Sequence, residues 1–131
     1  MKALTPLLLI LITGSALLAR GPESIEHVTP FSYNNYLIES LDDENLGIRA
    51  SAAQLIGQRG VWEAESALIR MLKKDEFYQA RIIAGLALMK MGGGEARQVI
   101  AQQARKDENL TVRHVLNGIV QEWNSRELTL R

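Results

Sequence analysis

Cysteine is absent from this 131-residue sequence, and aromatic residues make up only 5% of it. Without a thiol, the chain has no disulfide framework, no thiolate metal site, no cysteine nucleophile and no N-terminal cysteine for lipid attachment. An excess of charge of either sign is missing as well, because 15 basic and 15 acidic residues cancel. A general nucleic-acid binder normally shows a basic excess or a basic patch. We therefore expect no nucleic-acid partner.

Residues that carry catalysis or bind metal ions are also scarce. The two histidines, His27 and His114, are too far apart for a metal-ligand spacing, and no acidic pattern completes one. Gly92-Gly93-Gly94 lacks the Lys-Ser/Thr that follows a phosphate-binding loop, so we interpret it as the end of a helix. No nucleophile-elbow motif or nucleotide fingerprint occurs. We expect no enzyme activity, no cofactor, no catalytic residues and no metal site.

Residues 1–19 have the composition of a targeting segment. Lys2 forms a short positive region, Leu4 to Ile12 is an apolar run, and the small residues Ala16 and Ala19 suit cleavage. We predict a cleaved signal peptide and a periplasmic or secreted protein. The alternative is an uncleaved segment that anchors the chain in a membrane, although the apolar stretch is short for a bilayer span.

The rest of the chain is organised around a motif that occurs three times at a spacing of 32 residues. The motif reads Asp43-Glu44-Asn45-Leu46-Gly47-Ile48-Arg49, then Asp75-Glu76-Phe77-Tyr78-Gln79-Ala80-Arg81, then Asp107-Glu108-Asn109-Leu110-Thr111-Val112-Arg113. A fixed period of this length, without insertions, is typical of stacked repeats.

Apolar residues recur at equivalent positions of each copy and predict its core. These equivalent sets are Ile48, Ala80 and Val112; Ala52, Ala84 and Leu116; Leu55, Ala87 and Ile119; and Ile56, Leu88 and Val120. Within one copy they lie at i, i+4, i+7 and i+8, which is one face of an α-helix. Because helix-forming residues also dominate the composition, we predict an all-α superhelix, a solenoid of three helix pairs.

The repeats also predict the domain boundaries. Residues 20–35 contain two prolines and many polar residues, which favours a linker, with Ser32 as a cap for the first helix. The repeat domain should cover residues 36–123, and residues 124–131 should form a frayed tail. We expect helices near residues 33–41, 47–58, 62–74, 78–91, 95–106 and 110–123.

This pattern resembles the HEAT-repeat family, and within it the short repeats found in phycobilisome-lyase-like proteins. The matching residues are the turn aspartates Asp43, Asp75 and Asp107, the dipeptides Ile48-Arg49, Ala80-Arg81 and Val112-Arg113, and the small residues Ala52, Ala53, Ala84 and Gly85. The resemblance implies a right-handed helical solenoid that binds other proteins, and it does not imply lyase activity. Copy three departs from the pattern at Leu116-Asn117 and Trp123, which suggests a terminal, capping copy.

The aspartates and arginines of the motif predict a structural ladder. Each aspartate should accept backbone N–H groups at the start of the second helix of its copy. An arginine in the first turn of a helix is disfavoured by the helix dipole, so it should serve another purpose. The resemblance implies that it reaches a carboxylate or carbonyl in its own or the neighbouring turn. The ladder residues are Asp43, Arg49, Asp75, Arg81, Asp107 and Arg113.

One stripe of the second helices differs between the copies. Copy two has the large apolar residues Ile82, Leu86 and Met89 where copy one has Ala50, Gln54 and Gly57, and copy three has His114, Gly118 and Gln121. In the family, second helices line the concave surface of the solenoid. Either neighbouring segments cover the stripe, or it forms a partner-binding groove with His114 and Gln121 beside it.

We therefore expect an exported HEAT-repeat protein that serves as a scaffold or interaction module for an unidentified protein or peptide. One alternative is an accessory protein of an enzyme, or a lyase-like HEAT protein that handles a bound cofactor. Another is a membrane-tethered scaffold. A membrane partner is expected only if the N-terminal segment remains uncleaved.

Overall fold

The computed structural model describes residues 29–129, and every regular element in this range is a helix. The α-helices are α1 (Pro30–Glu39), α2 (Leu46–Arg59), α3 (Glu65–Lys74), α4 (Tyr78–Met91), α5 (Gly94–Lys106) and α6 (Leu110–Thr129). Short 3-10 helices cover Ser40–Asp42 after α1 and Trp62–Ala64 before α3. The predicted signal peptide at residues 1–19 and the predicted linker as far as residue 28 lie outside the described residues.

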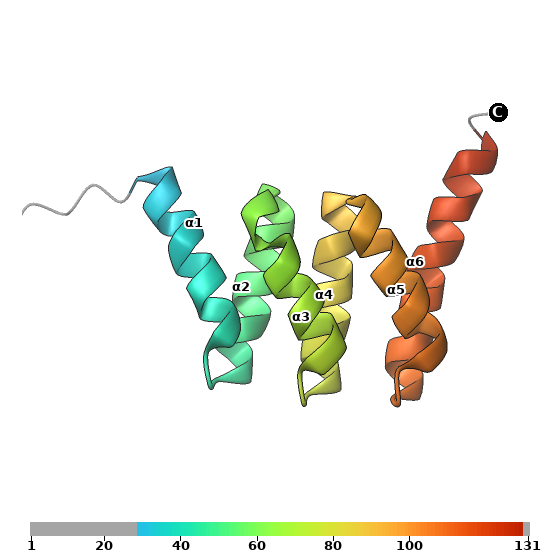
Figure 1. The fold of residues 1–131 in the computed structure, drawn as a ribbon, viewed down its shortest axis with the longest axis horizontal. Coiled ribbons are helices and arrows are strands. Elements are labelled where there is room, and N and C mark those ends of the chain that lie inside the picture. Colours follow the sequence, from blue (N-terminus) through green and yellow to red (C-terminus); the bar gives the residue numbers. More distant parts are fainter. Residues whose placement is uncertain (1–28, 130–131) are drawn as a thin grey trace, which may run out of the picture.

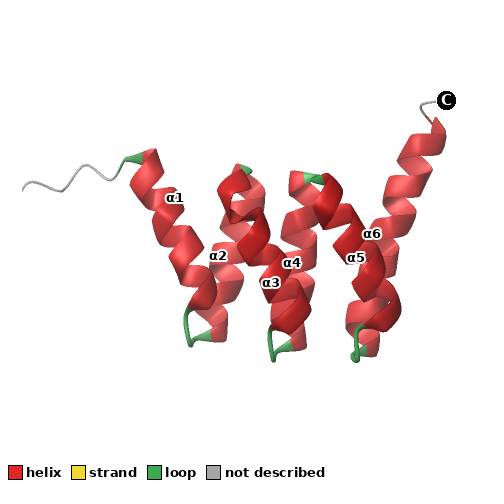
Figure 2. Cartoon of the chain, in the orientation of Figure 1, coloured by secondary structure: helices red, strands yellow, loops and turns green. Residues whose placement is uncertain are grey.

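The helices stack side by side as three antiparallel pairs, α1 with α2, α3 with α4, and α5 with α6 (Figure 1). Helices α2, α4 and α6 contact one another in order and form one layer, while α1, α3 and α5 form the other (Figure 1). The three Asp-Glu turns lie at the same end of the stack, and the shorter loops between pairs lie at the opposite end (Figure 2). The predicted all-α fold of three stacked helix pairs is confirmed.

Helix ends follow from local sequence. The side chain of Asn45 caps α2 by accepting a hydrogen bond from the Gly47 N–H at 2.8 Å. Gly60 and Gly92, which follow α2 and α4, have φ values of 65° and 79°. Glycine reaches this left-handed conformation without steric cost, so it ends a helix cleanly. The bounds predicted for α4, residues 78–91, are those of the structure.

One hydrophobic core runs through all three pairs. Ile56, Leu68, Leu88 and Leu116 are among its largest fully buried side chains. Most of the equivalent apolar positions lie in this core, but the prediction for Ile48 was wrong, because its side chain is 43% exposed.

The first pair explains this exception. Ala80 and Val112, the equivalents of Ile48, are 0% exposed because a helix pair precedes each of them. Among the described residues, no pair precedes α1 and α2. Leu55 and Val120, which were also predicted in the core, are half-buried. They belong to the first and the last pair, where neighbours cover one side.

Two glycines allow the second helices to approach one another closely. A Cβ atom on Gly57 of α2 would lie 2.7 Å from the Ala87 Cα of α4. A Cβ atom on Gly85 of α4 would lie 2.5 Å from Cδ2 of Leu116 in α6. Both distances are shorter than van der Waals contact, so glycine at these positions sets the spacing of the layer.

The boundary predicted between linker and repeat domain was wrong by several residues. Helix α1 begins at Pro30, so residues 30–35 are helical, and the N-cap is Thr29 in place of the expected Ser32. The Thr29 Oγ1 accepts a hydrogen bond from the Ser32 N–H at 3.1 Å. Pro30 suits the first helical position because the N–H it lacks would have no intrahelical acceptor there.

The prediction of a frayed tail from residue 124 was also wrong, because α6 continues to Thr129. Arg126 pairs with Glu122 one turn earlier, and Arg97 of α5 reaches Glu127. Arg97 also lies over the ring of Trp123, 4.9 Å from its centroid, and this tryptophan is only 8% exposed. The Arg126–Glu122 pair stabilises the last turns of α6, and the contacts of Arg97 hold this helix against α5 beyond the region where the apolar periodicity ends.

Candidate functional site

The three Asp-Glu turns share one geometry. In each turn the aspartate Oδ1 accepts a hydrogen bond from the backbone N–H two residues later. Asp43 accepts from Asn45 at 2.7 Å, Asp75 from Phe77 at 3.0 Å, and Asp107 from Asn109 at 2.9 Å. The aspartate thereby fixes the turn that leads into the second helix of its pair.

Arg49 and Arg81 join successive turns by using their whole guanidinium fork. The Nε and Nη2 atoms of Arg49 donate to the two carboxylate oxygens of Asp75 at 2.9 and 3.0 Å. Its Nη1 atom donates to the backbone carbonyls of Asp43 and Glu44 in its own turn, at 2.8 and 3.0 Å. The predicted alternatives, the neighbouring turn and the own turn, are therefore both used.

The second link repeats this arrangement one pair later. Arg81 donates to both oxygens of Asp107 at 2.9 Å each, and to the carbonyls of Asp75 and Glu76. The side chains of Arg81 and Asp107 are only 6% and 4% exposed. The hydrogen bond with Asp107 raises the pKa of Arg81 above its ordinary value, although burial lowers it, and Asp75 acts likewise on the pKa of Arg49. Both guanidinium groups thus stay charged.

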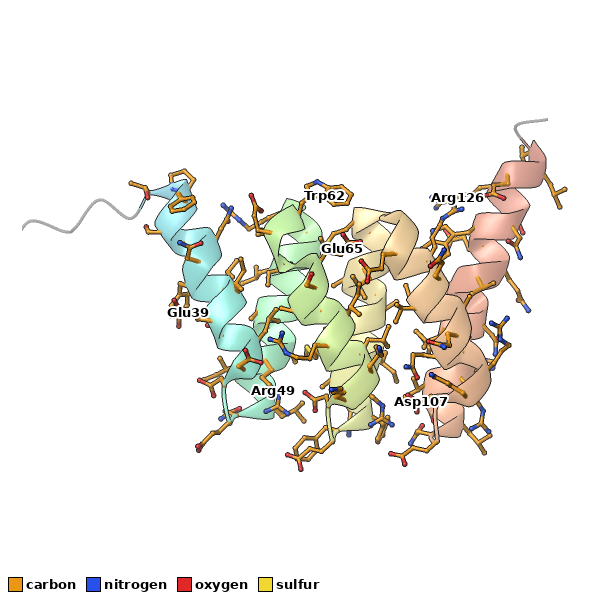
Figure 3. All side chains as sticks on the ribbon, in the orientation of Figure 1. Glu39, Arg49, Trp62, Glu65, Asp107 and Arg126 are labelled. Carbon is orange, nitrogen blue, oxygen red and sulfur yellow. The ribbon has the colours of Figure 1, made fainter. Side chains whose placement is uncertain are left out.

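The ladder has an open end on each side of the described stack. Arg113 donates through Nη1 to the carbonyls of Asp107 and Glu108, its own turn. Within residues 29–129 no aspartate of a following turn reaches it, and no arginine of a preceding turn reaches Asp43. Figure 3 shows Arg49 and Asp107 at the end of the stack where these turns lie.

The apolar stripe of copy two is divided by the structure. Ile82 and Met89 are half-buried and pack against the core, whereas Leu86 is 40% exposed. His114 and Gln121 of α6, at the positions equivalent to Ile82 and Met89, are exposed. Neighbours therefore partly cover the flanks of the stripe, its centre is accessible, and a partner-binding groove there stays a prediction.

A comparison of the chain with protein families bears on this fold. Residues 34–117, which are more than half of the chain, match the family described as HEAT repeats. The chain belongs to the HEAT-repeat family. No curated protein matches it. The match begins within α1 and ends within α6, so it includes all three turns and both arginine–aspartate links of this HEAT-repeat protein.

The HEAT layer of second helices carries a hollow of about 310 Å³ beside Leu86. Gln54 of α2 and Ile83, Leu86, Ala87 and Lys90 of α4 line it. Sequence reasoning singled out Leu86 but missed Ile83 and Lys90. Ile83 was missed because the repeat pattern contains no signal for a hollow between α2 and α4. Lys90 had a weak signal, since it lies one turn after Leu86.

Two further observations concern other kinds of site. No group of His, Asp and Glu side chains within the described residues is placed to hold a metal ion. Between Thr29 and Thr129, no helix is long and apolar enough to cross a membrane.

Proposed function

We propose that this HEAT-repeat chain is an exported interaction module that binds a protein or peptide on the layer formed by α2, α4 and α6. The observation that carries the proposal is the exposure of Leu86 in the middle of that layer. The equivalent residues in the other pairs are Gln54 and Gly118, so a large apolar side chain at this position is specific to the central pair. Stacking does not require it, because the other second helices pack without one.

The surroundings of Leu86 resemble the anatomy of a small binding site. An apolar centre formed by Leu86 and Ile83 lies next to a hollow of about 310 Å³, and Gln54 and Lys90 supply polar groups at its edge. Binding sites commonly place one accessible apolar anchor inside a polar rim. His114 and Gln121 are exposed on α6 but do not line this hollow. We infer a ligand that inserts an apolar side chain beside Leu86 and offers acceptors to Lys90.

Export rests on the sequence of residues 1–19, with its positive start, apolar run and small residues. The partner would then be a periplasmic or secreted protein, and the module would work without catalysis of its own. The relation to the short repeats of phycobilisome-lyase-like proteins stays a prediction. It is tested by the absorption spectrum of the purified protein, in which a visible band would favour the cofactor-handling alternative.

The test of the binding surface compares Leu86→Gln with Leu110→Gln. Leu86→Gln copies Gln54 of the first pair and lies outside the core, so the free energy of unfolding should change by less than about 1 kcal/mol. The same change should weaken partner capture by about 2 kcal/mol, the typical cost of losing a central apolar anchor. Leu110 is 73% exposed on α6 and lies at the turn end of the stack, so Leu110→Gln should leave capture unchanged.

Two results would contradict the proposal. If Leu86→Gln unfolds the domain in a urea titration, Leu86 belongs to the core. If both variants capture the partner as well as the unmodified chain in a pull-down, the ligand binds elsewhere.

A further inference from the structure

The end of the stack opposite α6 presents a surface that no other described element covers. We call it the N-terminal face and define it by Tyr33, Tyr36, Asp43, Ile48 and Leu55 of the first pair and the turn between its helices. A groove of about 500 Å³ runs between α1 and α2 on this face. In Figure 1 this is the end occupied by α1 and α2.

Residues on the N-terminal face have interior character. Tyr36 is 61% exposed, whereas its equivalents Leu68 and Ile100 are 0% exposed. Ile48 shows the same contrast with Ala80 and Val112. Terminal repeats of a solenoid normally carry a polar outer face, because nothing stacks on them. The first pair lacks such a face and keeps the apolar residues that later pairs bury against a preceding helix.

The opposite end of the stack is polar. Asn117 and Gln121 of α6 are exposed at the positions equivalent to Gly85 and Gly57, which face the next pair in α4 and α2. The Asn117 amide also donates a hydrogen bond to the Ala104 carbonyl at 3.1 Å. Docking that end onto another copy would bury the Gln121 side chain and the Asn117 side-chain oxygen against an apolar groove, which is costly for polar groups that gain no hydrogen bond there. A second copy stacked head to tail is therefore a poor occupant of the N-terminal face.

Asp43 adds a charge requirement to this face. Asp75 and Asp107 each receive a bidentate arginine from the preceding second helix. Asp43 is half-buried and has the same hydrogen bond to its own turn, but within residues 29–129 no basic side chain forms an ion pair with it. A helix placed on the N-terminal face as α2 is placed on the second pair would bring a cation to this carboxylate.

The chain's own N-terminal residues do not continue the repeat. Each ladder arginine lies 26 residues before its aspartate, and the residue 26 positions before Asp43 is Leu17. Gly21-Pro22 stand within the positions equivalent to a second helix, where proline would remove a backbone hydrogen bond.

We propose that the N-terminal face docks a helix from a partner protein, and that this helix carries an arginine followed by a small residue four positions later and an aliphatic residue eight positions later. Helix α4 carries this pattern at Arg81, Gly85 and Met89, and Arg81 and Gly85 contact the third pair at Asp107 and Leu116. On the N-terminal face the arginine pairs with Asp43, the small residue lies over Ala52, and the aliphatic residue enters the groove at Leu55. This surface is separate from the one around Leu86.

The test uses a labelled peptide of residues 78–91, stapled as a helix, titrated with the full chain in a fluorescence anisotropy assay. The peptide stands in for the partner helix. We expect saturable binding that weakens about tenfold in the Asp43→Asn chain, because a charge-assisted bidentate pair is lost. The affinity of an Arg81→Ala peptide for the unmodified chain should fall by a similar factor. Asn at position 43 still accepts the hydrogen bond of the turn, so the variant should remain folded.

Matched controls separate this surface from its neighbours. Asp42 is exposed, lies one residue away and pairs with Arg70, so Asp42→Asn should bind the peptide as the unmodified chain does. Leu86→Gln should also bind normally, which distinguishes this proposal from the proposed function. Equal binding by Asp43→Asn and Asp42→Asn, or absence of saturable binding, overturns the proposal.

Two other occupants of the N-terminal face would give different results, and either result would overturn the proposal of a partner helix. If only a chain lacking residues 1–28 binds the peptide, those residues occupy the face. If the chain self-associates in sedimentation and Arg113→Ala abolishes the association, a second copy occupies it.

Discussion

Replacing Arg81 by alanine tests the ladder where it is most buried. The change removes two hydrogen bonds to Asp107 and those to the carbonyls of Asp75 and Glu76. It leaves the Asp107 carboxylate, which is 4% exposed, with a hydrogen bond from the backbone N–H of Asn109. Removing one member of a buried ion pair typically costs about 3–5 kcal/mol, because the other charge stays buried. We expect a loss of about 3 kcal/mol, since Asp107 keeps one hydrogen bond.

Arg113→Ala provides the matched control within the same chain. Arg113 occupies the equivalent position in the last pair, but it bonds to the carbonyls of Asp107 and Glu108, and its removal strands no buried carboxylate. Loss of these hydrogen bonds to neutral carbonyl groups should lower the free energy of unfolding by about 1 kcal/mol. Both variants are compared by urea unfolding followed by circular dichroism, and similar m-values would show that both unfold to the same extent.

A double variant separates the charge penalty from lost packing. In the Arg81→Ala/Asp107→Ala variant, no carboxylate is left unpaired at position 107. The free energy of unfolding of this double variant should therefore fall by less than the sum of the losses in the two single variants. Equal losses for Arg81→Ala and Arg113→Ala would refute the reasoning, because burial of the partner would then have no effect. Strict additivity in the double variant would contradict it as well.

The remaining predictions concern helix spacing and processing. Gly57→Ala should destabilise the fold by about 1–3 kcal/mol, because the added Cβ would clash with the backbone of Ala87. Gly118→Ala should stabilise α6 by about 0.5–1 kcal/mol, because no atom beyond the adjacent residues and the helix's own backbone would lie within 4 Å of the added Cβ and alanine favours the helix. Thermal unfolding of both variants measures this contrast, and losses at both sites would argue against close packing as the reason for Gly57. N-terminal sequencing of exported protein should begin at Leu17 or Arg20; a chain that begins at Met1 in the membrane fraction would contradict a cleaved signal.

The fold could be predicted from the sequence because a 32-residue period relates three copies of each core position. Ala52, Ala84 and Leu116 were placed correctly, as buried residues of stacked second helices. Ile48 was misplaced because periodicity describes an average repeat, and burial also depends on whether a pair precedes it. The end of α6 was missed for a related reason. Residues 124–129 of α6 are exposed, and ion pairs there replace the apolar pattern that indicated helices elsewhere.

The candidate binding surface was predictable only in part. Leu86 stands out in the sequence because Gln54 and Gly118 occupy its equivalent positions. The partial burial of Ile82 and Met89 depends on how the neighbouring elements pack around α4. The hollow lined by Ile83 and Lys90 depends on how α2 and α4 pack against each other. Neither quantity is encoded in the spacing of residues along the chain.

A photo-crosslinking amino acid at position 86 tests the central claim, that this chain binds a protein on its second-helix layer, most directly. Leu86 is 40% exposed, so a crosslinker there reaches only what lies on that surface. The same amino acid at position 110, at the turn end of α6, serves as the control. We expect illumination of cells that produce the chain to give one discrete crosslinked species from position 86 and none of that size from position 110. Identical patterns from both positions, or no crosslinked species from position 86, would contradict a binding surface at Leu86.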